Sequence, residues 1–514
     1  MKKAIAILLC LMMLVSCFTA CGKAEDTPVA DNKAEAEDSG AADAAKRTDL
    51  KIQLVEEPAS MDSHNDTSLA RAYVALNLHA NLLTFDENGQ LVGELAESWS
   101  HNDELTEWTF VLKQGAKFSD GSDITVDDVI YTFQRGKDVG VRDDFKNIAF
   151  IEALSDTEVK FTLSSPNGRL DYGFAGDGFG IMSKAYVESG ADLTSEAAVT
   201  SGPYHLVDWT MGTSMTLKAN DTYVLGAPEI KDVEFIFIPD RNTAVVALES
   251  GQIDILCNGG TLNTAEIEVV ETFDGIQFVP RLSTTLINFV PNHRFEPFSD
   301  VNIRKAIDLA IDRDYLVAMT GKTRTPAGLI PATEQIGGYL PGYEAHARDL
   351  EAAKALMAES SYPDGFSFTV LANSSNVVAC EGLQAQLRDI GITMEVEQVA
   401  NASVIMERVK EGSLDAFCTG VTGRNGDVTG WIKLFNGDYT LNEDNEYAPM
   451  LAASNGLVGE ERDAMLKEAY DLITEDVPVW PLYWNDGCWA CDENLNFGVN
   501  NIFSYLRCNT MSWN

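Results

Sequence analysis

Residues 108–133 read WTFVLKQGAKFSDGSDITVDDVIYTF, and this stretch decides the fold class because its hydrophobic period changes along its length. Trp108 to Leu112 are aromatic and branched residues of the kind that form strands. Asp120-Gly121 is a turn signal. Thr125 followed by Asp128 resembles a capping box, which predicts a helix that continues to the end of the stretch. A strand, a turn and a helix in so short a segment indicate an α/β chain.

Helical patterns recur along the rest of the chain, and several of them end at a glycine. Residues 68–83 keep apolar side chains at helical spacing, which predicts an amphipathic helix, and residues 299–311 repeat the pattern. Around Gly251, Gly391 and Gly412, a helical segment is followed directly by a short strand-like run. Glycine tolerates the left-handed conformation that ends a helix. These repeated units indicate two lobes built from similar α/β elements.

The first residues have the order of a secretory signal peptide. Two lysines precede an apolar run, residues 4–15, that is too short to span a bilayer comfortably. The run leads to two cysteines in settings that resemble the bacterial lipobox. We expect residues 1–20 to be removed and Cys21 to be acylated, because a polar tract follows it at once. Cys17 is the alternative, although that cut leaves Phe18 beside the lipid, and an ordinary signal without a lipid is a third interpretation.

Residues 21–47 predict a lipidated, flexible tether. They hold hardly any aromatic or branched apolar side chains, so they bury too little surface to offset the entropy of ordering. The body from residue 48 onward is long enough for two or three domains, and the overall hydrophobic fraction of 45% is typical of a globular chain. The formal net charge of −42 argues against a nucleic acid partner, because phosphate binding requires a basic surface.

Two of the six cysteines beyond Cys21 have a suggestive spacing. Cys488 and Cys491 match the spacing of redox sites and of half a zinc site. A zinc site needs a second ligand pair, and a thioredoxin-like site needs its motif at the start of a helix after an early strand. We therefore favour a structural role or a local disulfide over redox catalysis, and an exported location permits the disulfide.

No signature of catalysis or of a bound cofactor occurs in the sequence. It lacks a Gly-x-Ser-x-Gly elbow, an HExxH pair and a complete Walker motif, since Gly321-Lys322-Thr323 has no glycine at the required distance before it. The six histidines lack ligand spacing, which favours ordinary surface or packing roles. They are His64, His79, His101, His205, His293 and His346. We therefore predict no enzyme activity, no metal and no cofactor.

An ordered series of motifs resembles the family 5 extracellular solute-binding proteins, which serve peptide, nickel and related importers. The most specific motif is the part of the opening stretch from Trp108 to Val129. The others, in chain order, are 58–62 (PASMD), 80–89 (ANLLTFDENG), 94–99 (ELAESW), 201–204 (SGPY), 220–223 (NDTY), 251–255 (GQIDI) and 383–392 (LQAQLRDIGI). The resemblance covers nearly the whole body.

The resemblance implies a two-lobe α/β fold like that of the periplasmic binding proteins, with an extra subdomain in the first lobe. Hinge strands join the lobes near residues 287–289 and 479–485, and the ligand lies in a cleft between the lobes that closes around it. The expected division is lobe I at 48–288 and 485–514, with an inserted subdomain at about 70–200, and lobe II at 289–484.

The loop of residues 422–427, TGRNGD, resembles the loop with which dipeptide-binding relatives hold a peptide ammonium group through an acidic residue. Arg424 stands where that acid is expected. A guanidinium repels an ammonium and binds a carboxylate or phosphate through two parallel hydrogen bonds. In the alternative interpretation, Arg424 faces solvent or pairs with Asp427. The expected ligand contacts are Arg424, Asn425, Asp427 and Trp431 in the second lobe, and Ser60, Met61, Tyr483 and Trp484 in the first lobe and hinge.

The predicted function is that of a monomeric, exported and lipid-anchored solute-binding protein, at the outer face of the bacterial cytoplasmic membrane or in the periplasm. It captures an oligopeptide or a similar small solute and delivers it to the membrane permease of an ATP-driven importer. One alternative is a receptor or sensor on the same fold, and another is a secreted hydrolase. A metal or haem carrier is a weaker alternative. The motifs do not identify the solute, because pocket residues vary on a shared fold.

Overall fold

The computed structural model describes most of the body and none of the N-terminal segment. The predicted signal peptide, Cys17, Cys21 and nearly all of the tether therefore lie outside the described residues, as do Arg424 and Asn425 of the 422–427 loop. The described residues are 46–66, 68–142, 145–321, 323–423, 426–442, 444–499 and 506–514.

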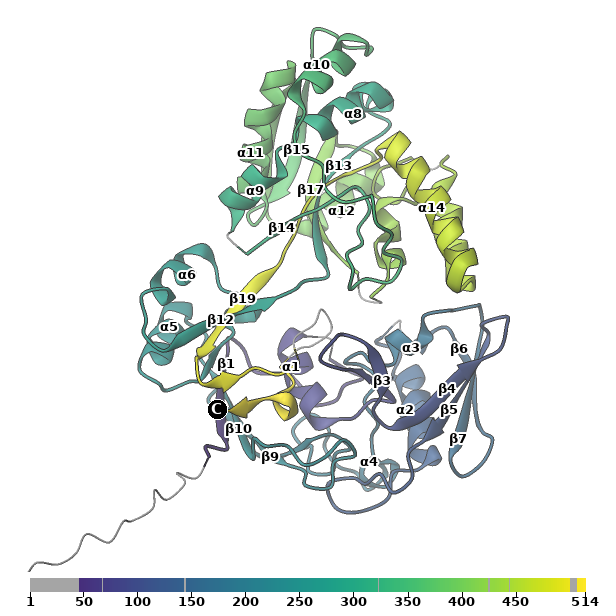
Figure 1. The fold of residues 1–514 in the computed structure, drawn as a ribbon, viewed down its shortest axis with the longest axis vertical. Coiled ribbons are helices and arrows are strands. Elements are labelled where there is room, and N and C mark those ends of the chain that lie inside the picture. Colours follow the sequence, from purple (N-terminus) through teal and green to yellow (C-terminus); the bar gives the residue numbers. More distant parts are fainter. Residues whose placement is uncertain are drawn as a thin grey trace, which may run out of the picture. The chain divides into compact units, whose positions relative to one another are not determined.

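A seven-stranded mixed sheet is formed by early strands and by one strand from near the C-terminus (Figure 1). Its central strand, β1, runs parallel to both of its neighbours. One face packs on α1 (Leu69–Leu78), and α5 (Arg241–Glu249) and α6 (Thr264–Val270) cover part of the other. The strand order is β12 (Ile276–Arg281), β19 (Gly487–Asp492), β11 (Ile255–Leu256), β1 (Asp49–Leu54), β10 (Asp232–Phe237), β9 (Ser214–Ala219) and β8 (Tyr204–Thr210).

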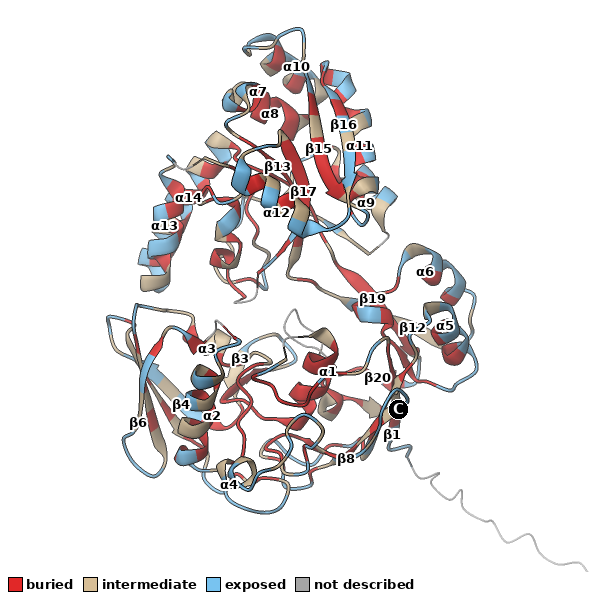
Figure 2. Cartoon of the chain, turned by 180° about the vertical axis from the view of Figure 1, so that it is seen from behind, coloured by how far each residue is buried: buried red, intermediate tan, exposed pale blue. Residues whose placement is uncertain are grey.

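A six-stranded sheet is buried on both of its faces (Figure 2). Along its strand β17, Ala416 and Cys418 belong to one apolar cluster while Phe417 and Val421 belong to the other. Helices on both sides of a sheet produce this pattern of continuous burial. The strand order is β14 (Thr325–Pro326), β18 (Trp480–Trp484), β13 (Thr285–Pro291), β17 (Ala416–Thr422), β15 (Ser367–Asn373) and β16 (Thr393–Val399).

The two faces of this sheet are covered by different helices. The first cluster includes residues of α8 (Val301–Ala310), α9 (Arg313–Thr320), α10 (Leu350–Ala358) and α11 (Val377–Leu387). The second includes residues of α12 (Ala402–Glu411), the 3₁₀ helix η4 (Val428–Leu434), α13 (Tyr447–Ala453) and α14 (Gly459–Asp476). Shorter helices are α3 (Leu170–Gly173), α4 (Lys184–Glu188) and α7 (Glu296–Ser299).

A four-stranded antiparallel sheet contains the stretch that opened the sequence analysis. Its order is β4 (Ala96–His101), β5 (Glu107–Leu112), β7 (Glu158–Leu163) and β6 (Ile148–Ala153), and α2 (Val126–Val139) packs on it. The predicted strand and capping box are confirmed, since Asp128 N donates to Thr125 Oγ1 and Thr125 N to the Asp128 carboxylate. The remaining strands form two short pairs, β2 (Leu83–Phe85) with β3 (Leu91–Gly93), and β20 (Leu495–Asn496) with β21 (Ser512–Trp513).

The helix predicted over residues 68–83 is too long at its C-terminal end, since α1 ends at Leu78. Beyond this point the backbone bonds to other parts of the chain: Ala80 N donates to Ser201 Oγ, and Ile181 N donates to Ala80 O. These bonds replace those that would continue the helix. The three predicted glycine stops are confirmed, because Gly251, Gly391 and Gly412 all have positive φ angles.

The local disulfide considered for the two C-terminal cysteines is wrong. Both Cys488 and Cys491 are free and buried in β19. Cys488 belongs to the cluster on one face of the seven-stranded sheet and Cys491 to the cluster on the other, because residues three apart on a strand point in opposite directions. That geometry prevents a bridge. Burial raises the pKa of Cys488 to about 11 and that of Cys491 to about 12, so both thiols stay neutral and serve packing.

The burial of the thiols predicts their reactivity. All six described cysteines are free and buried, so a chain that begins at residue 46 should react with a thiol reagent only after unfolding, and then at six positions. A colorimetric thiol assay with and without denaturant measures this. A count below six in the unfolded chain would show a disulfide, and the melting temperature would then depend on reductant.

A buried carboxylate links a partly exposed histidine to strand β18. Asp308 accepts a hydrogen bond of 2.6 Å from Arg313 and lies 2.7 Å from His346 Nε2. Arg313 Nε donates to Pro481 O in β18 at 2.9 Å. The hydrogen bond to Asp308 raises the pKa of His346 above its ordinary value. His346 is therefore protonated over a wider pH range in the folded chain than in the unfolded one.

This pair predicts a pH dependence of stability. Because the folded pKa of His346 is raised, its contribution is complete below the unfolded pKa of about 6.5 and is lost as the pH rises through the folded value. Water screens a histidine this exposed, so the loss should stay below about 1 kcal/mol. Urea unfolding at pH 6 and pH 9 should show this difference for the natural chain and not for His346→Gln. Equal pH dependence in the two chains would contradict the assignment.

Candidate ligand-binding site

The chain passes between the two large sheets through two neighbouring segments, residues 282–284 and 485–486, here called the crossing segments. The first joins β12 to β13 and the second joins β18 to β19. Arg281 pairs with Gly487 on one side of them, and Leu286 pairs with Trp484 on the other. Figure 1 shows β19 and β12 side by side where they approach the crossing. A ligand held between the two sheets would lie against these segments.

Within the crossing, one buried acid joins the two segments. Asp486 accepts a hydrogen bond of 2.8 Å from Ser283 N, and burial raises its pKa. Its backbone oxygen accepts a bond from Thr323 Oγ1 at 3.3 Å. These bonds fix the segments against each other and against the start of β14.

The 422–427 loop begins directly at the crossing. Gly423 N donates to Thr284 O at 3.0 Å, and the hydroxyl oxygens of Thr422 and Thr285 lie 2.8 Å apart. At the far end of the loop, Gly337 N donates to Gly426 O at 2.8 Å. The described ends of the loop are therefore attached at defined points on either side of the predicted contacts Arg424 and Asn425.

Asp427, a predicted ligand contact, is fully buried in an ion pair. Its carboxylate lies 2.7 Å from an Arg462 nitrogen and 3.6 Å from Arg169 Nε. It also caps η4 by accepting a bond of 3.0 Å from Thr429 N. Two arginines therefore hold this one carboxylate at the base of the loop. A ligand role for Asp427 stays a prediction, and the structure gives it a role in holding the loop.

The predicted aromatic contacts lie behind the loop. Trp431 is fully buried, donates from Nε1 to Val421 O at 2.9 Å, and meets the edge of Trp484 with ring centroids 5.4 Å apart. Any side chain at Gly423 would collide with the Trp431 ring. Tyr483 is also buried and accepts a bond of 3.3 Å from Arg324. The structure therefore groups Asp427, Trp431, Tyr483 and Trp484 near the crossing, while their contact with a ligand stays a prediction.

Ser60 and Met61 lie in a different environment. Ser60 Oγ accepts a bond of 3.0 Å from Asp62 N, and Asp62 forms an ion pair of 2.6 Å with Arg135 of α2. Met61 is 3% exposed and belongs to the same apolar cluster as Trp489. The contact of Ser60 and Met61 with a ligand stays a prediction.

Sequence reasoning missed the arginines at the crossing. Arg281 lies 6.0 Å from the Trp489 ring centre, and Arg324 lies 4.8 Å from the Tyr483 ring centre. Neither forms an ion pair with a carboxylate anywhere in the part of the chain that the structure describes. Arg281 also acts on Asp486, whose pKa it lowers against the larger, opposite effect of burial. The only sequence signal was Trp489 itself, which lies between the two cysteines that drew attention.

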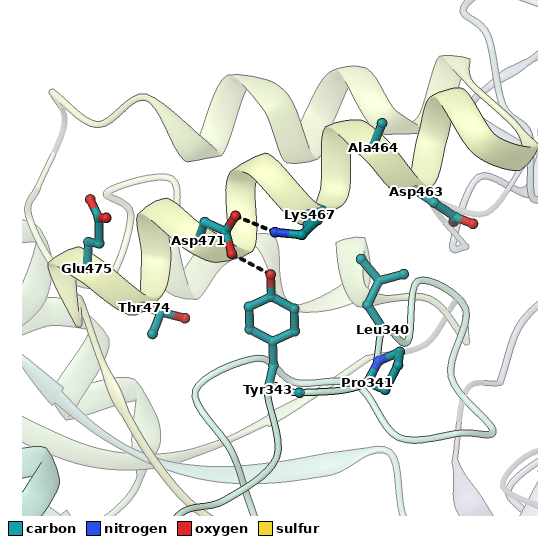
Figure 3. A pocket seen from close by; sticks show the side chains of 10 residues that line it. Leu340, Pro341, Tyr343, Asp463, Ala464, Lys467, Asp471, Thr474 and Glu475 are labelled. Carbon is teal, nitrogen blue, oxygen red and sulfur yellow. Dashed lines mark hydrogen bonds and ion pairs between the residues drawn. The ribbon is translucent and has the colours of Figure 1, made fainter.

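A groove of about 790 Å³ lies between the loop before α10 and one stripe of α14 (Figure 3). At its centre, Asp471 accepts bonds from Lys467 at 2.7 Å and from Tyr343 at 2.6 Å. Its other lining residues are Leu340, Pro341, Gly342, Asp463, Ala464, Thr474 and Glu475. None of the predicted ligand contacts lines this groove.

In the part of the chain that the structure describes, no group of three or more His, Cys, Asp or Glu side chains is placed to hold a metal ion. No helix in the same residues has the length and apolar character needed to cross a bilayer.

Two helix-covered sheets joined by two neighbouring crossing segments are the architecture of the two-lobe solute-binding proteins. Comparison with known families agrees: residues 90–442 match the bacterial extracellular solute-binding proteins, family 5. The chain belongs to this family, as its motifs predicted, and its function is to bind a solute.

Relatives agree with the family, and a solved structure agrees with the fold. The chain is 26% identical to the oligopeptide-binding protein AppA of Bacillus subtilis, over 96% of this chain and 95% of AppA. It is 24% identical to the heme-binding protein A of Haemophilus influenzae, over 80% and 82% of the two chains. The structure of HbpA2 from Haemophilus parasuis matches with a TM-score of 0.81 at 21% identity, over 91% of this chain and all of HbpA2. The predicted periplasmic-binding-protein-like fold is confirmed.

Proposed function

We propose that this protein captures an oligopeptide or a similar small solute between its two large sheets and delivers it to the permease of an ATP-driven importer. The oligopeptide-binding relative, aligned over nearly the whole of both chains, supports this solute class. Binding and release are the whole of its activity, without catalysis. Its partners are the solute and the membrane permease subunits.

We further infer that the solute presents a carboxylate or another anionic group to the 422–427 loop. The observation that carries this inference is the state of Asp427, whose carboxylate is already engaged by Arg462 and Arg169 and is not free to hold an ammonium group. Arg424, which lies within the loop itself, adds a third positive charge to those of Arg462 and Arg169. A guanidinium in such a position favours a planar anion.

The organisation predicted from the sequence completes the proposal. We keep the division into lobe I (48–288 and 485–514, with its insertion at about 70–200) and lobe II (289–484) as a proposal; the crossing segments at 282–284 and 485–486 lie within a few residues of its boundaries, and residues 285–288 pair in β13 of the six-stranded sheet. We propose that the chain acts as a monomer outside the cell, held to the membrane by a lipid on Cys21 or, alternatively, Cys17. The proposed ligand contacts are Arg424, Asn425, Asp427, Trp431, Ser60, Met61, Tyr483 and Trp484.

Native mass spectrometry of residues 46–514, purified from rich growth medium, tests the proposal. We expect a fraction of the protein to carry one small molecule, released intact on denaturation and identified as acidic or as a peptide with a free carboxylate. A released solute that is purely cationic would contradict the anionic site. Hydrolysis of the solute during incubation would instead favour the secreted hydrolase, and binding without any associated permease would favour a receptor or sensor.

A haem carrier is the second candidate, because one similar curated protein is named as heme-binding. The same experiment decides between the two. Bound haem would be visible by its absorbance and mass, and it would replace the peptide proposal.

A further inference from the structure

A second junction connects the four-stranded sheet to elements around the six-stranded sheet, separate from the crossing segments. It is formed by residues 167–169, which lie between β7 and α3. Asn167 N donates to Leu105 O at 3.0 Å, and Trp108 Nε1 donates to Asn167 O at 3.2 Å. This turn is therefore fixed to β5 and the loop before it.

The neighbouring residue of the turn contacts the chain after α13. Gly168 N donates to Asn455 O at 2.7 Å. A side chain at Gly168 would press on Leu457 O and the side chain of Val458. The backbone approach at this point is close enough to require glycine.

Arg169 extends from the same turn to Asp427. Its guanidinium stacks on the Tyr172 ring, with 3.4 Å between the guanidinium carbon and the ring centre, which limits its freedom. Its Nε lies 3.6 Å from the buried Asp427 carboxylate, and a side chain at Gly337 would collide with both groups. The arginine thus fills a space that the glycine leaves open.

The contacts close into a ring. Asp427 accepts a bond of 2.9 Å from Thr429 Oγ1, whose oxygen lies 3.2 Å from Asn455 Oδ1, and Asn455 in turn accepts the bond from Gly168. Asp427 is the last residue of the 422–427 loop. A substitution of Arg169 can therefore alter the position of the loop through the Asp427 carboxylate.

We propose that Arg169 is a positioning residue: through Asp427 it holds residues 426–434 and 455–458 in place, and so couples the four-stranded sheet to ligand retention. The effect on the ligand rests on the proposed function. The effect on residues 426–434 and 455–458 does not, because backbone exchange reports it whether or not the ligand is identified.

Hydrogen–deuterium exchange of the chain as purified provides the first test. Arg169→Ala keeps the Arg462–Asp427 pair, so the fold should persist while amides in residues 426–434 and 455–458 exchange about tenfold faster. Arg169→Lys should restore part of the protection. The matched control is Arg348→Ala, which removes an arginine of similar exposure whose partner, Asp389, lies on the same side of the crossing segments. Exchange in Arg169→Ala within about twofold of the natural chain would overturn the proposal.

Retention of the co-purified solute, measured by native mass spectrometry, provides the second test. We expect the loaded fraction to fall at least severalfold in Arg169→Ala and to recover in Arg169→Lys. Faster exchange with unchanged retention would overturn the coupling to ligand while the solute-binding function stands. If even the natural chain retains no solute, the proposed function fails and the exchange result alone decides the positioning role. Should Arg169→Ala not fold, Arg169→Gln gives the same two readouts.

Discussion

Replacing Asp427 with alanine is expected to lower the free energy of unfolding by about 3–5 kcal/mol, because it leaves buried positive charge without a partner. Arg462 is 8% exposed at its side chain and Arg169 is 19% exposed, so water replaces little of the lost interaction. The substitution also removes the cap of η4, which adds a smaller cost. Urea unfolding monitored by tryptophan fluorescence measures the change.

The control for Asp427→Ala is Asp471→Ala. Asp471 also accepts bonds from a cation and from a second group, here Lys467 and Tyr343, but it lies on the exposed stripe of α14 (Figure 3). Its loss should cost less than about 1 kcal/mol. Equal losses of unfolding free energy in the two variants would show that burial does not make the ion pairs of Asp427 more stabilising than those of Asp471.

The second large effect is expected at Arg424. If its guanidinium binds an anionic group of the solute, Arg424→Ala removes charge-assisted hydrogen bonds of about 1.5–3 kcal/mol, which weakens binding by about 10- to 100-fold. Arg424→Glu should weaken it further by repulsion. Isothermal titration with the solute released from the natural chain measures both changes.

Arg424→Lys and the melting temperature serve as controls for this substitution. Lysine keeps the charge and loses the bidentate geometry, so its affinity should fall between those of the natural chain and Arg424→Ala. None of the three variants should change the melting temperature of the ligand-free chain by more than a few degrees. Unchanged affinity in Arg424→Ala would remove this residue from the site.

Local features of the fold could be predicted because their causes are local. The Thr125 and Asp128 capping box needs only four residues, and the stop at Gly251 needs only the φ angle that glycine permits. The length of helix α1 was overestimated because its end has no local cause. Its end depends on hydrogen bonds to Ser201 and Ile181, residues whose position no local pattern reveals.

The location of the candidate site stays a prediction, and part of the chemistry around it could not be read from the sequence. The resemblance pointed to the 422–427 loop, and the structure attaches the described ends of that loop to the crossing and to Gly337. The two arginines on Asp427 could not be foreseen, because Arg169 and Arg462 come from distant segments and lie in no motif. Burial of Trp431 and Tyr483 likewise depends on which helices cover the six-stranded sheet.

Small-angle X-ray scattering of residues 46–514 with and without the co-purified solute tests the central claim most directly. Solute-free protein is prepared by partial unfolding and refolding, and the recovered solute is then added back. A solute-binding protein that closes around its ligand should bind one equivalent, decrease in radius of gyration, and release the solute chemically unchanged. An unchanged radius with no bound equivalent, or a solute that is recovered cleaved, would contradict the account.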